Sequence, residues 1–301
     1  MQTFIGSRAL PRLVYHRPTE RAEALRIMGD ESSWTLVAGG TDFIPGLRKG
    51  VWSYPDGVHV IDVRNLSGLQ EIRLDQGMVR IGAAARLADI IRSPVIQKHA
   101  PVLAEAVQDM ASVQVRNSAT IGGNLCTASP AADTAPPLLV LEAEVDLVDL
   151  KGNDKTLPLT DFFQGPGQCV CGDKKSLLTC IRFPALKAGE HFYRRKMGLR
   201  RAFTISVISM AMKSRAENHV CRDICLAFGA VAPTPIRARS TEDLVRGREL
   251  TAELIDQAAA QASSEVSPIS DVRASSDYRR DMAGVLTKRA LQSAVQSQEG
   301  S

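Results

Sequence analysis

A Gly-Gly pair inside residues 115–141 constrains the fold and function of this chain more than any other feature. Gly122 and Gly123 stand between an apolar approach and a run of small polar residues, and Asp133 follows in the same stretch. Because glycine has no Cβ, paired glycines let backbone amides come close to a ligand. Successive amides in such a turn form a concave nest that can hold a phosphate group. The stretch therefore predicts either a simple turn or one wall of an anion-binding site.

A second Gly-Gly loop lies upstream at residues 37–43, where Gly39 and Gly40 are followed by Thr41 and Asp42. A lone Gly-Gly turn is usually only a turn. Two such loops, each beside polar side chains that can accept hydrogen bonds, favour two walls of one pyrophosphate site. Neither loop has the G-x-G-x-x-G pattern of the Rossmann fold. The hypothesis is therefore a dinucleotide site on another kind of fold.

The composition makes several classes of function improbable. A chain of 301 residues with 44% hydrophobic and 23% charged residues is typical of a soluble globular protein with one large domain or two ordinary ones. The net charge of +4 is small and dispersed, so we expect no nucleic-acid partner. No stretch approaches the roughly 18 apolar residues of a transmembrane helix, and the N-terminus lacks the apolar segment of a signal peptide. We expect no membrane association and a cytoplasmic location.

The six cysteines show no motif spacing and predict no metal site. Thiols stay reduced in the cytoplasm, and buried cysteines behave as small hydrophobic side chains. We expect that role here, with no metal ion and no iron–sulfur cluster in this chain. The residues are Cys126, Cys169, Cys171, Cys180, Cys221 and Cys225.

The pattern of apolar residues divides the chain near residues 185–190. Before this point short strands, loops and short helices alternate. After it come strand-length apolar blocks at 205–213 and 224–231, and then helical patterns at 251–262 and 279–295. Strands and helices in separate runs are typical of an α+β unit. We expect two domains, residues 1–184 and residues 190–295.

Four segments, in order and with their spacing kept, resemble the FAD-binding medium subunits of molybdenum hydroxylases, above all those of bacterial xanthine dehydrogenases. They are residues 37–50, 115–141, 196–206 and 226–238. The resemblance runs from about Leu13 to Val295. It implies an α+β fold made of a two-part FAD-binding domain of the p-cresol methylhydroxylase and vanillyl-alcohol oxidase type. A small C-terminal α+β domain of the CO dehydrogenase flavoprotein type follows.

The resemblance also implies which residues contact FAD. The first glycine loop would wrap the pyrophosphate, and the second would supply opposing backbone amides and a hydroxyl. Asp133 would lie near the ribose and phosphates, and Lys196 near the flavin ring. Leu178 and Thr179 would line the isoalloxazine, and Met110 would cover the adenine side. The residues of the two loops are Leu36, Val37, Ala38, Gly39, Gly40, Thr41, Asp42 and Phe43, and Thr120, Ile121, Gly122, Gly123 and Asn124.

The residues themselves leave alternatives open. Asp133 could cap the helix that follows it. Lys196 lies in a basic run, and such runs are usually solvated faces. Arg200 and Arg201 could pair with acidic groups on a partner rather than touch FAD.

The resemblance implies an electron-transfer subunit with no catalytic residue of its own. A large subunit with molybdopterin would oxidise the substrate, and a small subunit with [2Fe–2S] clusters would deliver electrons to FAD in this chain. The acceptor would be NAD+ or another oxidant, and the assembly a dimer of heterotrimers. The substrate would bind in the large subunit, so this chain does not identify it. Two alternatives are a stand-alone flavin-dependent oxidoreductase of the same fold and a non-catalytic nucleotide-binding protein.

Overall fold

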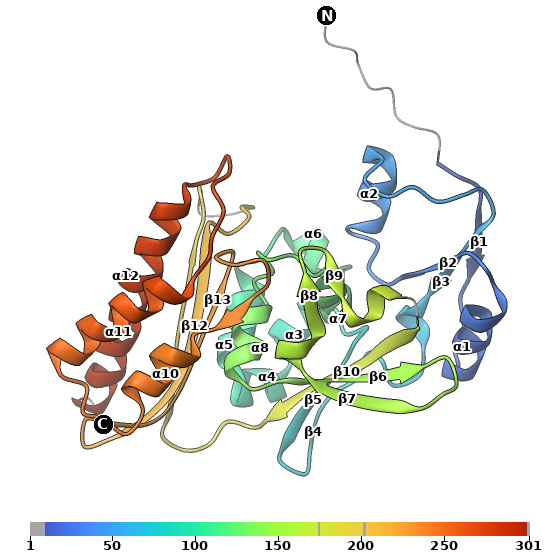
Figure 1. Cartoon of the computed structure of the whole chain (residues 1–301). Coiled ribbons are helices and arrows are strands. Elements are labelled where there is room, and N and C mark those ends of the chain that lie inside the picture. Colours follow the sequence, from blue (N-terminus) through green and yellow to red (C-terminus); the bar gives the residue numbers. More distant parts are fainter. Residues whose placement is uncertain (1–9, 174, 201–202, 300–301) are drawn as a thin grey trace, which may run out of the picture.

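The computed structural model describes residues 10–173, 175–200 and 203–299. Its sheets follow one another along the molecule (Figure 1). A three-stranded N-terminal sheet lies at one end, a five-stranded sheet in the middle, and a four-stranded sheet with its helices at the other end. This mixture of helices and separate sheets confirms the predicted α+β fold.

The N-terminal sheet is parallel, with strand order β1-β3-β2. Its strand β2 runs directly into the first glycine loop, so this loop lies at the carboxyl end of a parallel strand, where ligands commonly bind in parallel sheets. The loop is followed by helix α2, which ends at Gly50 in the left-handed conformation with φ of 69°. The elements are β1 (Leu13–His16), α1 (Arg21–Asp30), β2 (Trp34–Val37), α2 (Phe43–Lys49), β3 (Val58–Asp62) and the 3-10 helix η1 (Val63–Asn65).

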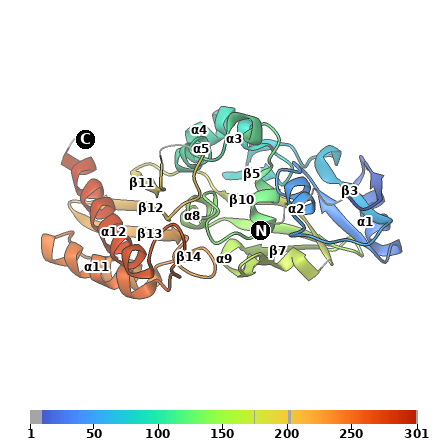
Figure 2. The same cartoon turned by 90° about the horizontal axis from the view of Figure 1, so that it is seen from above.

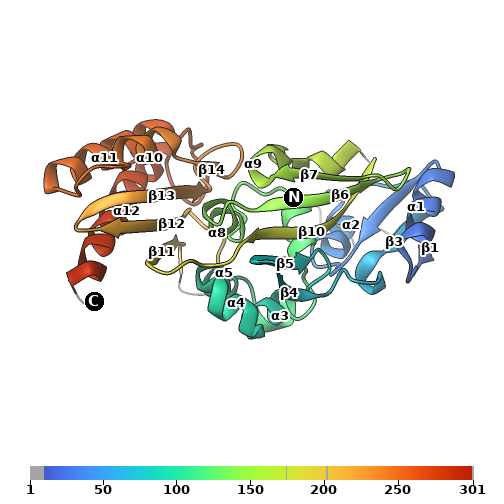
Figure 3. The ribbon, with the colours of Figure 1, turned by 90° about the horizontal axis from the view of Figure 1, so that it is seen from below.

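The central sheet has the order β4-β5-β10-β6-β7, and its neighbouring strands are antiparallel (Figure 3). Strand β10 carries an irregularity between Leu178 and Cys180, which leaves Thr179 out of register with β6. The carbonyl of Thr179 accepts a hydrogen bond from the Ala83 amide at 2.9 Å. The strands are β4 (Ile72–Asp75), β5 (Met78–Gly82), β6 (Glu144–Asp149), β7 (Asp154–Pro158) and β10 (Ser176–Pro184).

Short helices between β5 and β6 pack on this sheet and form the main hydrophobic core with it. They include α7, which holds the second glycine pair. They are α3 (Leu87–Arg92), α4 (Pro94–His99), α5 (Pro101–Gln108), α6 (Val113–Arg116), α7 (Ile121–Cys126) and α8 (Ala135–Val140). Between β7 and β10 lie α9 (Leu159–Phe162), β8 (Phe163–Gly165), β9 (Gln168–Cys169) and the 3-10 helix η2 (Val170–Asp173).

The C-terminal sheet is an antiparallel run, β11-β12-β13-β14. Helices α10, α11 and α12 lie on its outer side, and α8 packs against β12 and β13 on the inner side (Figure 2). The predicted C-terminal helices are confirmed, while the two long strands begin and end a few residues from their predicted positions. The elements are β11 (Glu190–Met197), β12 (Ile208–Glu217), β13 (Val220–Gly229), β14 (Ile236–Arg237), α10 (Arg239–Val245), α11 (Ala252–Glu265) and α12 (Ser276–Glu299).

A buried ion pair stabilises this C-terminal unit. Glu242 is 1% exposed and accepts hydrogen bonds from the Leu226 amide at 2.7 Å and from Arg237 Nε at 2.8 Å. We expect Glu242→Gln to lower the free energy of unfolding by about 1–3 kcal/mol, because the buried guanidinium of Arg237 loses the nearer of its two carboxylate partners, Glu242 at 2.6 Å and Glu142 at 3.5 Å. Urea unfolding measures this. Asp256→Asn is the matched control, because its pair with Lys288 is exposed and such pairs contribute at most about 1 kcal/mol. Equal losses in both variants contradict the assignment.

Candidate functional site

The two glycine regions lie in contact. The hydroxyl of Ser118 donates a hydrogen bond to the Gly39 carbonyl at 2.7 Å. A Cβ at Gly39 would stand 2.2 Å from the Ser118 carbonyl oxygen and 2.7 Å from the Ala119 Cα. Only glycine permits backbones to approach this closely. The structure therefore brings the two loops together, as the sequence predicts, and FAD binding there stays a prediction.

The first loop carries unused hydrogen-bond donors. From Gly39 to Asp42, no backbone amide donates to another residue that the structure describes. Gly40 has a φ of +69°, which turns the chain into α2. Buried or partly buried amides without partners are uncommon in native proteins, so each such group needs an explanation. These donors at the start of a helix match the predicted phosphate nest.

The second loop differs from the prediction, because it is the first turn of helix α7 rather than an open turn. Thr120 caps this helix, and its hydroxyl accepts from the Gly123 amide at 3.1 Å. The amides of Ile121 and Gly122 donate at 3.0 and 2.8 Å to the carbonyls of Ala85 and Ala83, which follow β5, and the amide of Asn124 donates to the Thr120 carbonyl. The amides of residues 121–124 therefore already have partners within the protein, and the contact of this loop with FAD stays a prediction.

Packing explains the glycine at position 122. A Cβ there would stand 2.6 Å from the carbonyl oxygen of Ala83, next to the end of β5. The side-chain amide of Asn124 has one group free to bind a ligand. Its oxygen accepts a hydrogen bond from the Thr134 hydroxyl at 2.6 Å, whereas its NH2 group donates to no described residue. That amide group is the donor that α7 offers toward a ligand.

Thr127 also connects the two loops, and the sequence reasoning missed it. Its hydroxyl lies 3.0 Å from Asp42 Oδ2 and 2.9 Å from the Gly123 carbonyl oxygen. The signal that could have found it is its position one helical turn beyond Gly123, on the face of α7 that the glycines share.

Asp133 and Lys196 form a buried ion pair. Both side chains are 8% exposed, and Lys196 Nζ lies 2.7 Å from Asp133 Oδ2. Ser206 donates its hydroxyl to the other carboxylate oxygen, and Lys196 also reaches the Asp109 carbonyl at 3.2 Å. The pair joins the segment before α8 to strand β11.

Both alternative roles for this pair are wrong. Helix α8 has Thr134 at its N-cap position with no side-chain capping bond, so Asp133 does not cap it. Lys196 is buried and therefore does not belong to a solvated face. Arg200 donates to the Phe203 carbonyl within its own loop. Arg201 lies outside the described residues.

The remaining predicted site residues fall in different surroundings. Met110 is 8% exposed, follows Asp109 directly, and therefore lies beside Lys196. Thr179 reaches the second glycine region through its bond to Ala83. Leu178 belongs to the main hydrophobic core. Phe43 packs against Trp52 and Tyr54, with ring centroids 6.1 and 6.0 Å apart, so it supports the loop from behind.

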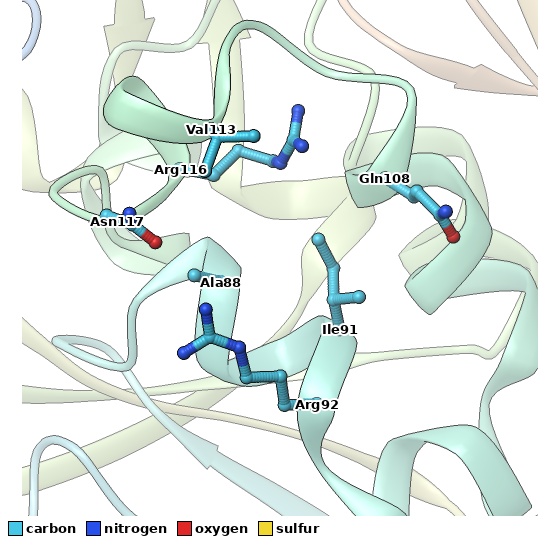
Figure 4. A pocket seen from close by; sticks show the side chains of 7 residues that line it. All are labelled: Ala88, Ile91, Arg92, Gln108, Val113, Arg116 and Asn117. Carbon is cyan, nitrogen blue, oxygen red and sulfur yellow. The ribbon is translucent and has the colours of Figure 1, made fainter.

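Two cavities of about 210 Å³ each are lined by residues outside the two glycine loops. Figure 4 shows the first, where Arg92 and Arg116 project from two helices toward one opening. The second includes Thr179 and Cys180. Both are smaller than the roughly 300–1,000 Å³ usual for drug-sized ligands. The candidate site is therefore the surface that the loops and the Asp133–Lys196 pair share.

Comparisons with family models match nearly the whole chain. Residues 8–186 match the model described as the FAD binding domain in molybdopterin dehydrogenase. Residues 193–294 match the model of the CO dehydrogenase flavoprotein C-terminal domain. Among the helices of the described residues, none combines the length and hydropathy needed to cross a bilayer.

Individual proteins agree with these models. The putative xanthine dehydrogenase FAD-binding subunit of Escherichia coli K12 is 33% identical over 291 residues, covering 95% of this chain and 97% of that protein. The glyceraldehyde dehydrogenase medium chain of Sulfolobus acidocaldarius is 33% identical, covering 93% and 98%. A solved chain of carbon monoxide dehydrogenase from Hydrogenophaga pseudoflava superimposes with a TM-score of 0.89 at 31% identity, covering 96% of this chain and 99% of that chain.

Proposed function

The chain belongs to the family of FAD-binding domains of molybdopterin dehydrogenases, and we propose that it is the subunit through which electrons pass from a partner's [2Fe–2S] clusters, by way of FAD, to NAD+ or another acceptor. It is an FAD-dependent oxidoreductase subunit of the molybdenum hydroxylase type. The relatives named above are described as an FAD-binding subunit and a medium chain.

One observation carries the proposed cofactor site: the unpaired amides from Gly39 to Asp42, at the start of α2 and against the second glycine region. These donors fit the pyrophosphate of FAD, because backbone amides at a helix start bind phosphate oxygens. FAD, when bound, supplies the redox chemistry. The chain orients it through the first loop, the Asn124 side chain and Thr127.

The flavin end is proposed to lie toward Lys196, Asp133 and Met110. These residues lie beside each other and are tied to α7 through Thr134, whose hydroxyl reaches Asn124 at 2.6 Å. The remaining predicted contacts, Leu36 to Phe43, Thr120 to Asn124, Leu178 and Thr179, belong to the same proposal. Within it, the Asp133–Lys196 pair connects the proposed FAD-binding domain, residues 1–184, to the proposed C-terminal domain, residues 190–295.

The partners in this proposal are a molybdopterin-binding large subunit and a [2Fe–2S] small subunit, assembled as a dimer of heterotrimers in the cytoplasm. The substrate is oxidised in the large subunit. A stand-alone oxidoreductase of the same fold would instead turn over a substrate by itself.

The experiment compares the chain purified alone with the chain co-expressed with its partners. Alone, it is expected to show the absorbance of oxidised flavin, to be reoxidised by an acceptor after chemical reduction, and to be inert toward purines and aldehydes. A tagged chain is expected to co-purify with molybdopterin and iron–sulfur subunits. Substrate turnover by the single chain contradicts the division of labour, and a colourless chain that takes up no FAD contradicts the cofactor assignment.

A further inference from the structure

A small pocket opens between helices α3 and α6, outside the proposed cofactor site (Figure 4). Ile91 points into it from α3, and Val113 lines it from α6. The polar side chains around these apolar ones carry no negative charge: Arg92, Gln108, Arg116 and Asn117. The volume of about 210 Å³ suits one inserted side chain rather than a dinucleotide.

Helix α6 leaves its apolar side chains outside the hydrophobic core. None of its residues, Val113–Arg116, is buried, and Val113 itself is 57% exposed. Single exposed apolar residues are common on protein surfaces, but this one faces a pocket whose other wall, on α3, is also apolar. An apolar centre within a polar rim is the usual anatomy of a protein–protein interface.

Both guanidinium groups of the pocket lack an anionic partner in the described part of the chain. Arg116 Nη1 donates to the carbonyl oxygens of Met110 and Ala111 at 2.5 and 3.1 Å, which fixes this side chain in place. Arg92, in the last turn of α3, forms no hydrogen bond with another described residue. The pocket is therefore positively charged and complementary to an acidic group.

The cysteines do not contribute to this pocket. Three of them are buried, as predicted for small hydrophobic side chains: Cys169, Cys221 and Cys225. The prediction is wrong for the three that are partly exposed, Cys126, Cys171 and Cys180. None of the six lines the space between α3 and α6.

The pocket lies beside the proposed cofactor site. Met110, whose neighbour Asp109 accepts a hydrogen bond from Lys196, comes shortly before α6, and Ser118, which contacts Gly39, follows it. A protein seated on α6 would therefore lie next to the proposed position of FAD. Electrons pass between two redox groups only over short distances, so the subunit that supplies electrons to FAD has to bind close to it.

We propose that the α3–α6 pocket receives an apolar side chain of the [2Fe–2S] partner subunit, with a carboxylate of the same segment held by Arg92 and Arg116. This proposal rests on the proposed function, since it assigns the docking surface of the subunit that delivers electrons to FAD. The apolar side chain is buried against Ile91 and Val113. The carboxylate neutralises two guanidinium groups that have no anionic partner in the described part of the chain.

The first test identifies the occupant in the co-expressed complex. A photo-cross-linking phenylalanine analogue replaces Val113, which is exposed and therefore tolerates a larger side chain. Irradiation followed by mass spectrometry is expected to find a cross-link to the [2Fe–2S] subunit. The same analogue in place of the exposed Arg289 on α12 is the control and is expected to give no cross-link to that subunit.

The second test measures the contribution of charge. Arg92→Glu is expected to raise the dissociation constant of the [2Fe–2S] subunit, measured by dilution of the purified complex, at least about tenfold, because two like charges would then face each other. Arg289→Glu changes the net charge equally and is expected to leave this constant unchanged. The FAD content is expected to be the same in both variants and the parent chain. Arg92→Ala is expected to make the constant less dependent on salt.

The outcomes separate this proposal from the proposed function. A tagged parent chain that recovers no iron–sulfur subunit refutes both. If the parent recovers it, three results refute only the docking surface. These are equal binding by Arg92→Glu and Arg289→Glu, a cross-link from position 113 to the molybdopterin subunit, or an intact Arg92→Glu complex that needs more NAD+ to reoxidise its flavin.

Discussion

Gly39→Ala is expected to raise the dissociation constant for FAD at least about tenfold. The added Cβ would stand 2.2 Å from the Ser118 carbonyl oxygen and 2.7 Å from the Ala119 Cα, both of them backbone atoms that cannot rotate away. Overpacking of this kind costs about 1–3 kcal/mol, and about 1.4 kcal/mol corresponds to tenfold in affinity. The loops must separate, and the amides that follow Gly39 then no longer face one phosphate. Titration of the apo chain with FAD measures the change.

Gly29→Ala is the matched control. Gly29 lies in helix α1, and a Cβ there meets nothing within 4 Å. Alanine favours helix over glycine by up to about 1 kcal/mol, so this variant is expected to be as stable as the parent or more so, with its FAD affinity unchanged. If Gly39→Ala binds FAD as tightly as Gly29→Ala, the pyrophosphate does not lie at this loop.

Local patterns in the sequence predicted the features that depend on local structure. The apolar blocks at 224–231 and 251–262 correspond to β13 and α11. Such elements can be predicted because the spacing of apolar residues within a short segment differs between strands and helices. The first glycine loop was also predictable, since a Gly-Gly pair beside hydroxyl and carboxylate side chains is recognisable within a few residues, whereas the second pair lies in the first turn of α7.

Features that depend on distant residues could not be predicted. Position 122 requires glycine because Ala83 packs directly against it. The two residues are distant in the sequence and meet only in the folded chain. The sequence suggested Thr120 as a ligand hydroxyl, and it did not show that this hydroxyl caps α7. A threonine three residues before a polar or small residue fits both roles, so the sequence alone does not separate them.

The sequence around Lys196 contains some information on its burial beyond the basic charge of the run. Lys196 lies in a basic run, but that run forms strand β11, where side chains alternate between two faces. Arg195 is exposed, while Arg194 and Lys196 point inward, and Arg194 pairs with Asp109 at 2.7 Å. Alternation places Lys196 on the same face as Arg194, but both faces of β11 are partly covered, so the sequence alone does not identify Lys196 as buried. Its partner Asp133 was beyond prediction from spacing.

Asp133→Ala is expected to have the largest effect on stability, lowering the free energy of unfolding by about 3–5 kcal/mol. The substitution leaves the Lys196 ammonium 8% exposed and without its carboxylate, and breaking a buried pair on one side is costly for that reason. It also removes the acceptor of the Ser206 hydroxyl. FAD affinity is expected to fall about ten- to a hundredfold, if the carboxylate also accepts a hydrogen bond from the cofactor.

A double-mutant cycle with Lys196→Met separates these two contributions, because it removes the buried charge along with the carboxylate. We expect the double variant to recover part of the lost stability but not the lost FAD affinity. Asp109→Asn weakens the ion pair between Arg194 and the half-exposed Asp109 carboxylate. It is expected to lower the free energy of unfolding by no more than about 1 kcal/mol. Urea unfolding and FAD titration of all four variants decide the outcome. An unchanged dissociation constant in Asp133→Ala with reduced stability would leave Asp133 a purely structural role, because its only partners would then be Lys196 and Ser206.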